Sequence, residues 1–213
     1  MSISSFANEG ISALAAACAA RLDRSVDQPL LSVVIPVFDN WDTTARCLSS
    51  VVRCDADVSV EIIVVDDGST DATSEVLSRL PALNVVRNSR NIGFVHSCNR
   101  GAAIARGKYL FFLNNDTELH PGAIATLVRR IEGDDRIGVV GSKLIYPDGA
   151  LQEAGGIVWA DGFVWNFGRL HEAGRPEYNF VRDVDFVSGA ALLVRTELFS
   201  EAGRFDERYA PAY

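Results

Sequence analysis

Carboxylate and carboxamide side chains occur in three short groups, and each group directly follows a run of apolar residues. A buried strand gains nothing from polar groups at its end unless solvent, a turn or a bound ligand satisfies them. Any one group could be an ordinary turn or helix start, whereas three groups at one edge of one sheet would favour a binding site. Their oxygen atoms are of the kind that a hard cation prefers. The groups are Asp39 and Asn40, Asp66 and Asp67, and Asn114, Asn115 and Asp116.

The elements that must position these groups alternate between strand and helix patterns. Val- and Ile-rich runs predict strands covered on both faces, and the helical patterns between them have Asp42 and Asp71 as expected N-caps. We therefore predict an α/β fold with a largely parallel central sheet and helices on both faces. Ligands bind such sheets at the carboxyl ends of the strands. The expected strands span residues 30–38, 60–67, 85–87, 109–113 and 137–145, and the expected helices residues 42–53, 71–80, 94–105 and 122–132.

A polar linker, Asp23–Pro29, divides the chain into two expected parts. Residues 1–29, with an Ala-rich helical pattern over Ile11–Leu22, are expected to be an appendage, and residues 30–213 the main domain. Beyond Pro147 the alternation stops, and "YPDGA" predicts a turn between extended segments. Residues 154–182 are rich in glycine and aromatic residues without a helical period, and residues 183–194 resume as strands. The aromatic residues could stack on a sugar ring or plug the edge of the sheet as core. They are Trp159, Phe163, Trp165 and Phe167.

Composition narrows the classes of function. The 213 residues carry a formal net charge of -8 and a pI of about 4.9, which argues against nucleic acid as a partner. The four cysteines form no C-x-x-C pair and have no histidine at zinc-ligand spacing, so they are expected to be reduced and mostly buried. No stretch approaches the roughly 18 apolar residues of a membrane span, and the N-terminus lacks a leader pattern. The sequence therefore predicts a cytoplasmic protein.

The turn after the first strand excludes a hydride-transfer dinucleotide site. That turn, Ile35–Asn40, contains no glycine, whereas the dinucleotide fingerprint needs glycines where the backbone meets the pyrophosphate. A P-loop is also absent. A pyrophosphate bound here would therefore need a metal ion, Mg²⁺ or Mn²⁺, held by oxygen ligands such as Asp116.

Six segments, in order, resemble the successive motifs of family 2 glycosyltransferases. They are "SVVIPVFDN", "EIIVVDDGSTDAT", "NIGFVHSCNRG", "YLFFLNNDTEL", "VDFVSGAALLVR" and "FDERY". The resemblance covers the chain from about Leu31 onward and is closest to the bacterial subgroup similar to rhamnosyltransferases, which build surface polysaccharides. It implies the GT-A fold, with a Rossmann-like nucleotide-binding half and an acceptor-side half.

The resemblance also implies roles for individual residues. Pro36 and Phe38 would line the base pocket, with the Phe38 ring on a pyrimidine, and Asp67 would accept from the base N–H. The residues at the Asp-x-Asp position would face the ribose and hold the metal on the diphosphate. The remaining matches are Arg90 and Asn91 in the loop beside the nucleotide, Asn114 at the ribose with Asn115 beside it, Asp116 at the metal, and Ser188, Gly189 and Ala190 near the acceptor.

Two departures from the family pattern bear on catalysis. Asn114 stands where the family has an aspartate, so Asp116 would carry metal binding nearly alone and the free ion should bind weakly. The family's general base lies in an acidic pair that follows a segment like "FDERYAPAY", so the base is expected just after Tyr213. Asp206 and Glu207 are expected to be a turn and helix start rather than the base.

The implied reaction is metal-dependent, inverting transfer of a sugar from a UDP- or dTDP-linked donor to a saccharide or lipid-linked acceptor. A lipid-linked acceptor would bring the enzyme to the inner face of the membrane as a peripheral protein. The main alternative is a non-catalytic nucleotide-sugar-binding or scaffolding domain of a larger synthase. A third reading, a nucleotidyltransferase, lacks its Gly-rich basic first loop.

Overall fold

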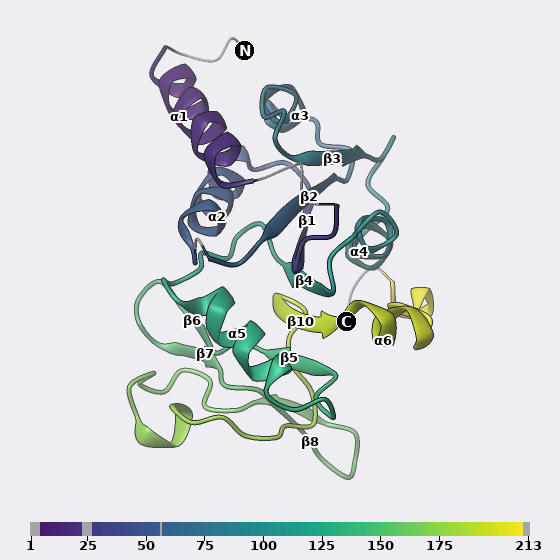
Figure 1. Cartoon of the computed structure of the whole chain (residues 1–213). Helices are drawn as coiled ribbons and strands as arrows, with labels where there is room; N and C mark the ends of the chain where they lie inside the picture. The colour runs from purple at the N-terminus through teal and green to yellow at the C-terminus, as the bar shows by residue number, and fades with distance from the viewer. Residues whose placement is uncertain (1–4, 23–26, 56, 211–213) are drawn as a thin grey trace.

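The computed structural model describes residues 5–22, 27–55 and 57–210, and it confirms an α/β fold (Figure 1). Its main sheet has six strands in the order β3-β2-β1-β4-β10-β5. Each strand lies at or within a few residues of a segment where the apolar pattern predicted one. The strands are β1 (Leu31–Val37), β2 (Val60–Asp66), β3 (Asn84–Arg87), β4 (Tyr109–Leu113), β5 (Val139–Gly141) and β10 (Ala191–Arg195).

The sheet is largely parallel, as predicted, with one strand reversed. Strands β3, β2, β1 and β4 pair in parallel, and β10 runs antiparallel between β4 and β5. Ala191 at the start of β10 pairs with Leu113 at the end of β4. The segment just before β10 therefore lies at the carboxyl edge of the parallel strands.

Helices cover both faces of this sheet (Figure 1). Side chains alternate along each strand, so the two faces bury different residues. Val34, Ile63 and Phe112 pack toward α4 and α6, whereas Val33, Ile62 and Phe111 belong to the cluster with α1, α2, α3 and α5. The helices are α1 (Ser5–Arg21), α2 (Trp41–Arg53), α3 (Thr73–Leu77), α4 (Phe94–Ala102), α5 (Ala123–Glu132) and α6 (Thr196–Glu201).

Helix α1 packs against α2 and shares its core. Ile11, Leu14 and Cys18 are buried in the same cluster as the sheet residues. The helix is longer than the segment Ile11–Leu22 that the sequence predicted. Residues 23–26 of the expected linker lie outside the described residues, and a domain boundary at residue 29 stays a prediction.

The start of α2 corrects one expectation. Asp42 is not the N-cap, because the helix begins at Trp41 and Asn40 precedes it in the left-handed conformation, with a φ of 64°. Asp42 instead lies in the first turn, where a carboxylate interacts favourably with the helix dipole. The cap expected at Asp71 is also displaced, because α3 begins at Thr73 and Ala72 is its N-cap. Asp71 Oδ1 nevertheless accepts a hydrogen bond of 2.9 Å from the Thr73 amide.

After β5 the chain forms small hairpins instead of alternating strands and helices. The "YPDGA" turn is confirmed, with hydrogen bonds between Tyr146 and Ala150 and between Gly149 and Tyr146. Trp159, Phe163 and Trp165 are exposed on the second hairpin, so they do not plug the sheet. The short elements are β6 (Leu144–Ile145), β7 (Leu151–Glu153), β8 (Gly156–Val158), β9 (Val164–Asn166) and the 3₁₀ helices Pro176–Tyr178 and Glu207–Tyr209.

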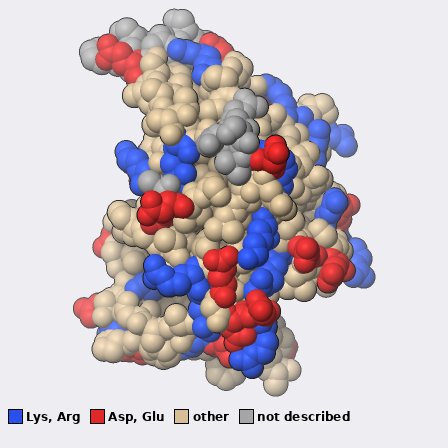
Figure 2. Space-filling model, in the orientation of Figure 1, with Lys and Arg blue, Asp and Glu red and all other residues tan. Residues whose placement is uncertain are grey.

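All four cysteines are free and buried, as predicted. In the described part of the chain, no helix combines the length and apolar character that crossing a bilayer requires. Figure 2 shows acidic and basic side chains interspersed over one face of the molecule.

Candidate functional site

The three polar groups follow the adjacent strands β1, β2 and β4, so the fold brings them to one edge of the sheet. The loops after β1 and β2 are hydrogen-bonded to each other. The Asp39 amide donates to Ser69 Oγ at 2.8 Å, and Asp39 Oδ1 accepts from the Thr70 amide at 2.6 Å. The Asn40 amide donates to Asp71 Oδ2 at 2.8 Å. Asp39 and Asn40 therefore fix loop geometry.

Asp67 is almost fully enclosed and holds the loop that follows β3. Its Oδ1 accepts from Asn88 Nδ2 at 2.6 Å and from the Ile92 amide at 2.9 Å, and its Oδ2 accepts from the Gly93 amide at 2.9 Å. A carboxylate can accept about four hydrogen bonds, so Oδ2 has room for one further donor. Asp67 thus joins the end of β2 to the start of α4.

Arg90 and Asn91 are exposed on this same loop. Their backbone lies directly on Gly68, which has a φ of +80°, and a Cβ built on Gly68 would meet Arg90 C at 2.6 Å. Only glycine fits both the backbone conformation and this close approach. The loop predicted to lie beside the nucleotide is therefore packed onto the end of β2.

Pro36 and Phe38 lie where β1 leaves the sheet. Pro36 is partly exposed within the strand, and Phe38 follows its last residue, with a side chain that is 47% exposed. An aromatic ring of this size is ordinarily buried, so Phe38 offers an apolar surface beside the polar groups.

Asn114, Asn115 and Asp116 begin the loop after β4. Asn115 Nδ2 donates to Thr44 Oγ1 on α2 at 3.0 Å, whereas Asn114 Oδ1 is enclosed and has no hydrogen-bond partner among the described residues. Asp116 is exposed. Burial raises the pKa of the Cys47 thiol on α2 to about 12, and the negative charges of Asp116 and Glu118 add to that rise.

Ser188, Gly189 and Ala190 lead into β10 and lie against this loop. The Asn114 amide donates to the Ala190 carbonyl at 2.9 Å, and Gly189 lies next to the Phe94 ring. The structure therefore brings together the residues predicted for the nucleotide, the metal and the acceptor side.

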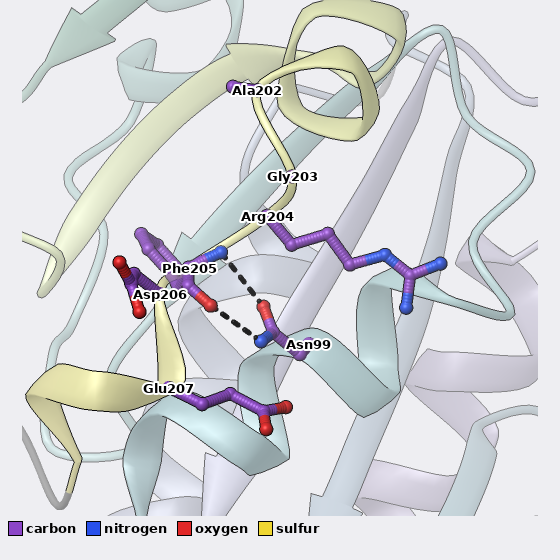
Figure 3. Close-up of a pocket in the computed structure, with 7 residues that line it drawn as sticks. All are labelled: Asn99, Ala202, Gly203, Arg204, Phe205, Asp206 and Glu207. Atoms are coloured by element: carbon purple, nitrogen blue, oxygen red, sulfur yellow. Dashed lines mark hydrogen bonds between the residues drawn. The ribbon is translucent and has the colours of Figure 1, made fainter.

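The C-terminal segment is fixed to α4. The Asn99 carboxamide donates to the Phe205 carbonyl at 2.8 Å and accepts from the Phe205 amide at 3.0 Å (Figure 3). Asp206 caps a 3₁₀ helix by accepting from the Arg208 amide at 2.9 Å, which confirms the predicted turn and helix start. Asn99 and residues 202–207 line a pocket of about 470 Å³.

Comparison with known proteins decides the family. Residues 32–200 match the model of glycosyl transferase family 2. The chain belongs to glycosyl transferase family 2. Among its relatives is the O-antigen biosynthesis protein RfbC of Myxococcus xanthus, 30% identical over 192 residues, which cover 85% of this chain and 15% of RfbC. The chain spans 35%, 21% and 15% of three curated relatives that it matches.

Two solved structures of glycosyltransferases share the fold. Mannosyltransferase PcManGT from Pyrobaculum calidifontis, in complex with GDP-Man and Mn²⁺, has a TM-score of 0.62 at 17% identity, over 93% of this chain and 56% of that one. GalNAc-T7 with UDP, GalNAc and Mn²⁺ has a TM-score of 0.63 at 22% identity, over 85% of this chain and 38% of that one. The GT-A fold implied by the sequence motifs is therefore confirmed.

Two buried polar residues of this family 2 domain were not identified from the sequence. Asn88 is 1% exposed and bonds to Asp67, and it directly follows β3, so it is a fourth polar residue at a strand end. Its place directly after a predicted strand is the signal in the sequence from which Asn88 could have been identified. Glu153 is 3% exposed at the end of β7, and no spacing in the sequence distinguishes it from a surface glutamate.

Burial raises the pKa of the Glu153 carboxyl, and a hydrogen bond from the Ser188 amide only partly opposes the rise. The folded state then binds the proton more tightly than the unfolded state. Protonated Glu153 therefore stabilises the fold fully at pH values below the ordinary glutamate pKa, and this contribution is lost as the pH rises through the raised pKa. We expect Glu153→Gln to melt above the parent protein at pH 8. Each kcal/mol that the substitution adds to the free energy of unfolding raises the melting temperature by about 2–4 °C.

Melting curves of both proteins between pH 4 and 8 test this expectation. The difference should shrink as the pH falls toward 4, because the parent carboxyl then becomes protonated. Glu172→Gln, at an exposed glutamate, is the matched control and should show no such trend. A difference that is constant with pH, or a variant that melts lower at pH 8, would contradict burial of the Glu153 charge as the cause.

Proposed function

We propose that this domain transfers a sugar, with inversion, from a UDP- or dTDP-linked donor to a saccharide or lipid-linked acceptor in surface polysaccharide synthesis. The observation that carries the proposal is the gathering of Phe38, Asp67, Asn114 and Asp116 at one sheet edge of a family 2 domain. The resemblance to rhamnosyltransferases makes a deoxysugar such as rhamnose a candidate for transfer. RfbC, an O-antigen biosynthesis protein, supports polysaccharide synthesis as the context.

The base of the nucleotide would lie on Phe38. Its ring is half exposed, and the free acceptor position at Asp67 Oδ2 could take the imino N–H of a pyrimidine. The exposed side chains of Arg90 and Asn91 would flank the base, because Gly68 fixes their loop against β2. Uracil and thymine fit this proposal, since each has an imino N–H that can donate to a carboxylate.

The residues after β4 fit a divalent cation bound together with a diphosphate. Asp116 supplies one exposed carboxylate, and no cluster of three or more His, Cys, Asp or Glu side chains arranged for a metal occurs among the described residues. One carboxylate alone suits an ion whose other ligands come from phosphate and water. When bound, Mg²⁺ or Mn²⁺ would stabilise negative charge on the departing diphosphate. The enclosed Asn114 Oδ1 would accept from a ribose hydroxyl.

In the proposed reaction an acceptor hydroxyl oxygen attacks the anomeric carbon. The bond between the anomeric carbon and the diphosphate oxygen breaks, and the diphosphate leaves with the electron pair. The hydroxyl proton passes to a general base. Ser188, Gly189 and Ala190 lie beside Asn114 and would form part of the acceptor side. Four reduced thiols agree with a reaction in the cytoplasm, and a lipid-linked acceptor would place it at the inner face of the membrane.

A thermal-shift screen of UDP, dTDP, ADP and GDP, with and without Mn²⁺, tests the proposal. A ligand at about 100 times its Kd stabilises the folded state by about 2.7 kcal/mol. For a domain of this size that corresponds to roughly 5–10 °C. We expect UDP or dTDP to raise the melting temperature in the presence of Mn²⁺. A clear preference for ADP or GDP, the two purine nucleotides, would overturn the assignment.

Replacing Phe38 with alanine should weaken pyrimidine nucleotide binding by about 1–3 kcal/mol, roughly 5- to 150-fold, because the stacking surface is lost. The melting temperature without ligand should change little, since the ring is already half exposed. Titration calorimetry with UDP measures the loss. Phe163→Ala, at another exposed phenylalanine, is the control and should bind UDP like the parent. Equal affinity in both variants would remove Phe38 from the base site.

A further inference from the structure

Glu153 is a buried carboxylate with too few partners. It ends β7 and is 3% exposed, and the hydrogen bond found for it is a long one, 3.3 Å from the Ser188 amide to Oε1. No lysine or arginine of the described chain forms an ion pair with it. A buried carboxylate ordinarily accepts several hydrogen bonds or pairs with a cation, because an uncompensated buried charge is costly. The fold therefore tolerates a charge here that it does not satisfy.

The position of Glu153 relates it to the proposed donor site. Ser188, which donates to Glu153, and Ala190, which accepts from the Asn114 amide, are two residues apart in one segment. Glu153 and Asn114 thus hold the two ends of the segment that leads into β10. Among the described residues, Asn114 Oδ1 is enclosed and has no hydrogen-bond partner. Glu153 Oε2 has no hydrogen bond there either, and it does not belong to the enclosed atoms. Two oxygen acceptors with unused capacity therefore flank Ser188, Gly189 and Ala190.

The order of strands sets the direction in which a donor would lie. Along the sheet the order is β2, β1, β4 and β10, so the edge passes from Asp67 to Phe38, then to Asn114, and then to Ser188–Ala190. A nucleotide sugar is a linear sequence of base, ribose, diphosphate and sugar. With the base on Phe38 and the diphosphate at Asn114–Asp116, the sugar would lie over the segment before β10, next to Glu153.

We propose that Glu153 accepts a hydrogen bond from a hydroxyl group of the donor's sugar and so helps select which sugar is transferred. This inference rests on the proposed function. A carboxylate kept poorly satisfied by the protein gains more from a sugar hydroxyl than a well-paired one does. Hydrogen bonds to charged groups are also stronger than those between neutral groups.

The test compares each nucleotide sugar with its own nucleoside diphosphate, because the difference isolates the sugar. Titration calorimetry with Mn²⁺ would use UDP, UDP-glucose, UDP-galactose, UDP-N-acetylglucosamine, dTDP and dTDP-rhamnose on the parent and on Glu153→Gln. We expect the parent to bind at least one nucleotide sugar more tightly than the matching diphosphate. Glu153→Gln should lose about tenfold or more of that preference while its affinity for the diphosphate stays unchanged.

Controls separate a role in binding from a role in folding. Glu172→Gln should keep the parent's preference, and the melting curve of Glu153→Gln reports whether it is folded. Equal weakening of the diphosphate and its sugar form, no change in either, or a parent that binds UDP or dTDP without preferring any sugar form would each overturn the role of Glu153. A parent that binds none of the nucleotides would instead overturn the proposed function, and the inference with it.

Discussion

Replacing Asp116 with alanine should abolish the part of nucleotide binding that depends on Mn²⁺, leaving the same Kd for UDP with and without the ion. Asp116 is the exposed carboxylate of the loop after β4, and Asn114 contributes no charge beside it. The ion would therefore lose its charged protein ligand. Titration calorimetry of UDP with and without Mn²⁺ measures the change, and a metal contribution of tenfold corresponds to about 1.4 kcal/mol.

Asp116→Asn separates charge from shape in the same experiment. It should behave nearly like Asp116→Ala, because a carboxamide keeps the size of the side chain but not its charge. Glu118→Gln, two residues away and paired with Arg46 on the surface, is the matched control and should keep the Mn²⁺ dependence. Unchanged Mn²⁺ dependence in both Asp116 variants would mean that this residue is part of the loop and not of a metal site.

Replacing Asp67 with alanine should destabilise the fold by about 3 kcal/mol or more. The variant removes three hydrogen bonds to a charged group, and such bonds contribute about 1.5–3 kcal/mol each. The Ile92 amide loses its acceptor, whereas Asn88 Nδ2 keeps Ser97 Oγ and the Gly93 amide keeps Asn91 Oδ1. The expected fall in melting temperature is on the order of 10 °C. Because the loop with Arg90 and Asn91 would be released, UDP binding should weaken as well. Thermal unfolding and calorimetry measure the two effects.

Asp67→Asn should be intermediate, because it retains one acceptor oxygen but places an amide donor near the Gly93 N–H. Asp57→Ala, at an exposed aspartate, should leave both quantities close to those of the parent. A melting temperature for Asp67→Ala within about 2 °C of the parent would show that these hydrogen bonds contribute little to the fold.

The strands that carry the site could be predicted because they are buried on both faces. Such strands have continuous apolar runs, and the residues that interrupt the runs mark their ends. Asp67 and Asn114 were found in this way, whereas Pro36 and Phe38 came from the resemblance to family 2 glycosyltransferases. The insertion of β10 between β4 and β5 could not be predicted, since it depends on pairing between residues about 80 positions apart, such as Leu113 and Ala191.

The hydrogen-bond partners of the site residues could not be predicted from the sequence either. The pattern marked Asp67 as a polar residue at a strand end, but not that Asn88 and two backbone amides already occupy most of its acceptor capacity. Glu153 gave no signal, because its burial arises from a hairpin that folds back against the segment before β10. The start of α2 was misplaced because Asn40 adopts a left-handed conformation that the choice of Asp42 as cap did not anticipate.

A crystal structure of this chain grown with UDP and Mn²⁺, with the ion located by its anomalous signal, would test the proposed donor site most directly. We expect the uracil ring to stack on Phe38. The Mn²⁺ peak should lie within coordination distance, about 2.0–2.4 Å, of an Asp116 carboxylate oxygen and of the diphosphate. UDP bound elsewhere, for instance in the pocket between Asn99 and Arg204, or a Mn²⁺ peak away from Asp116, would contradict this site.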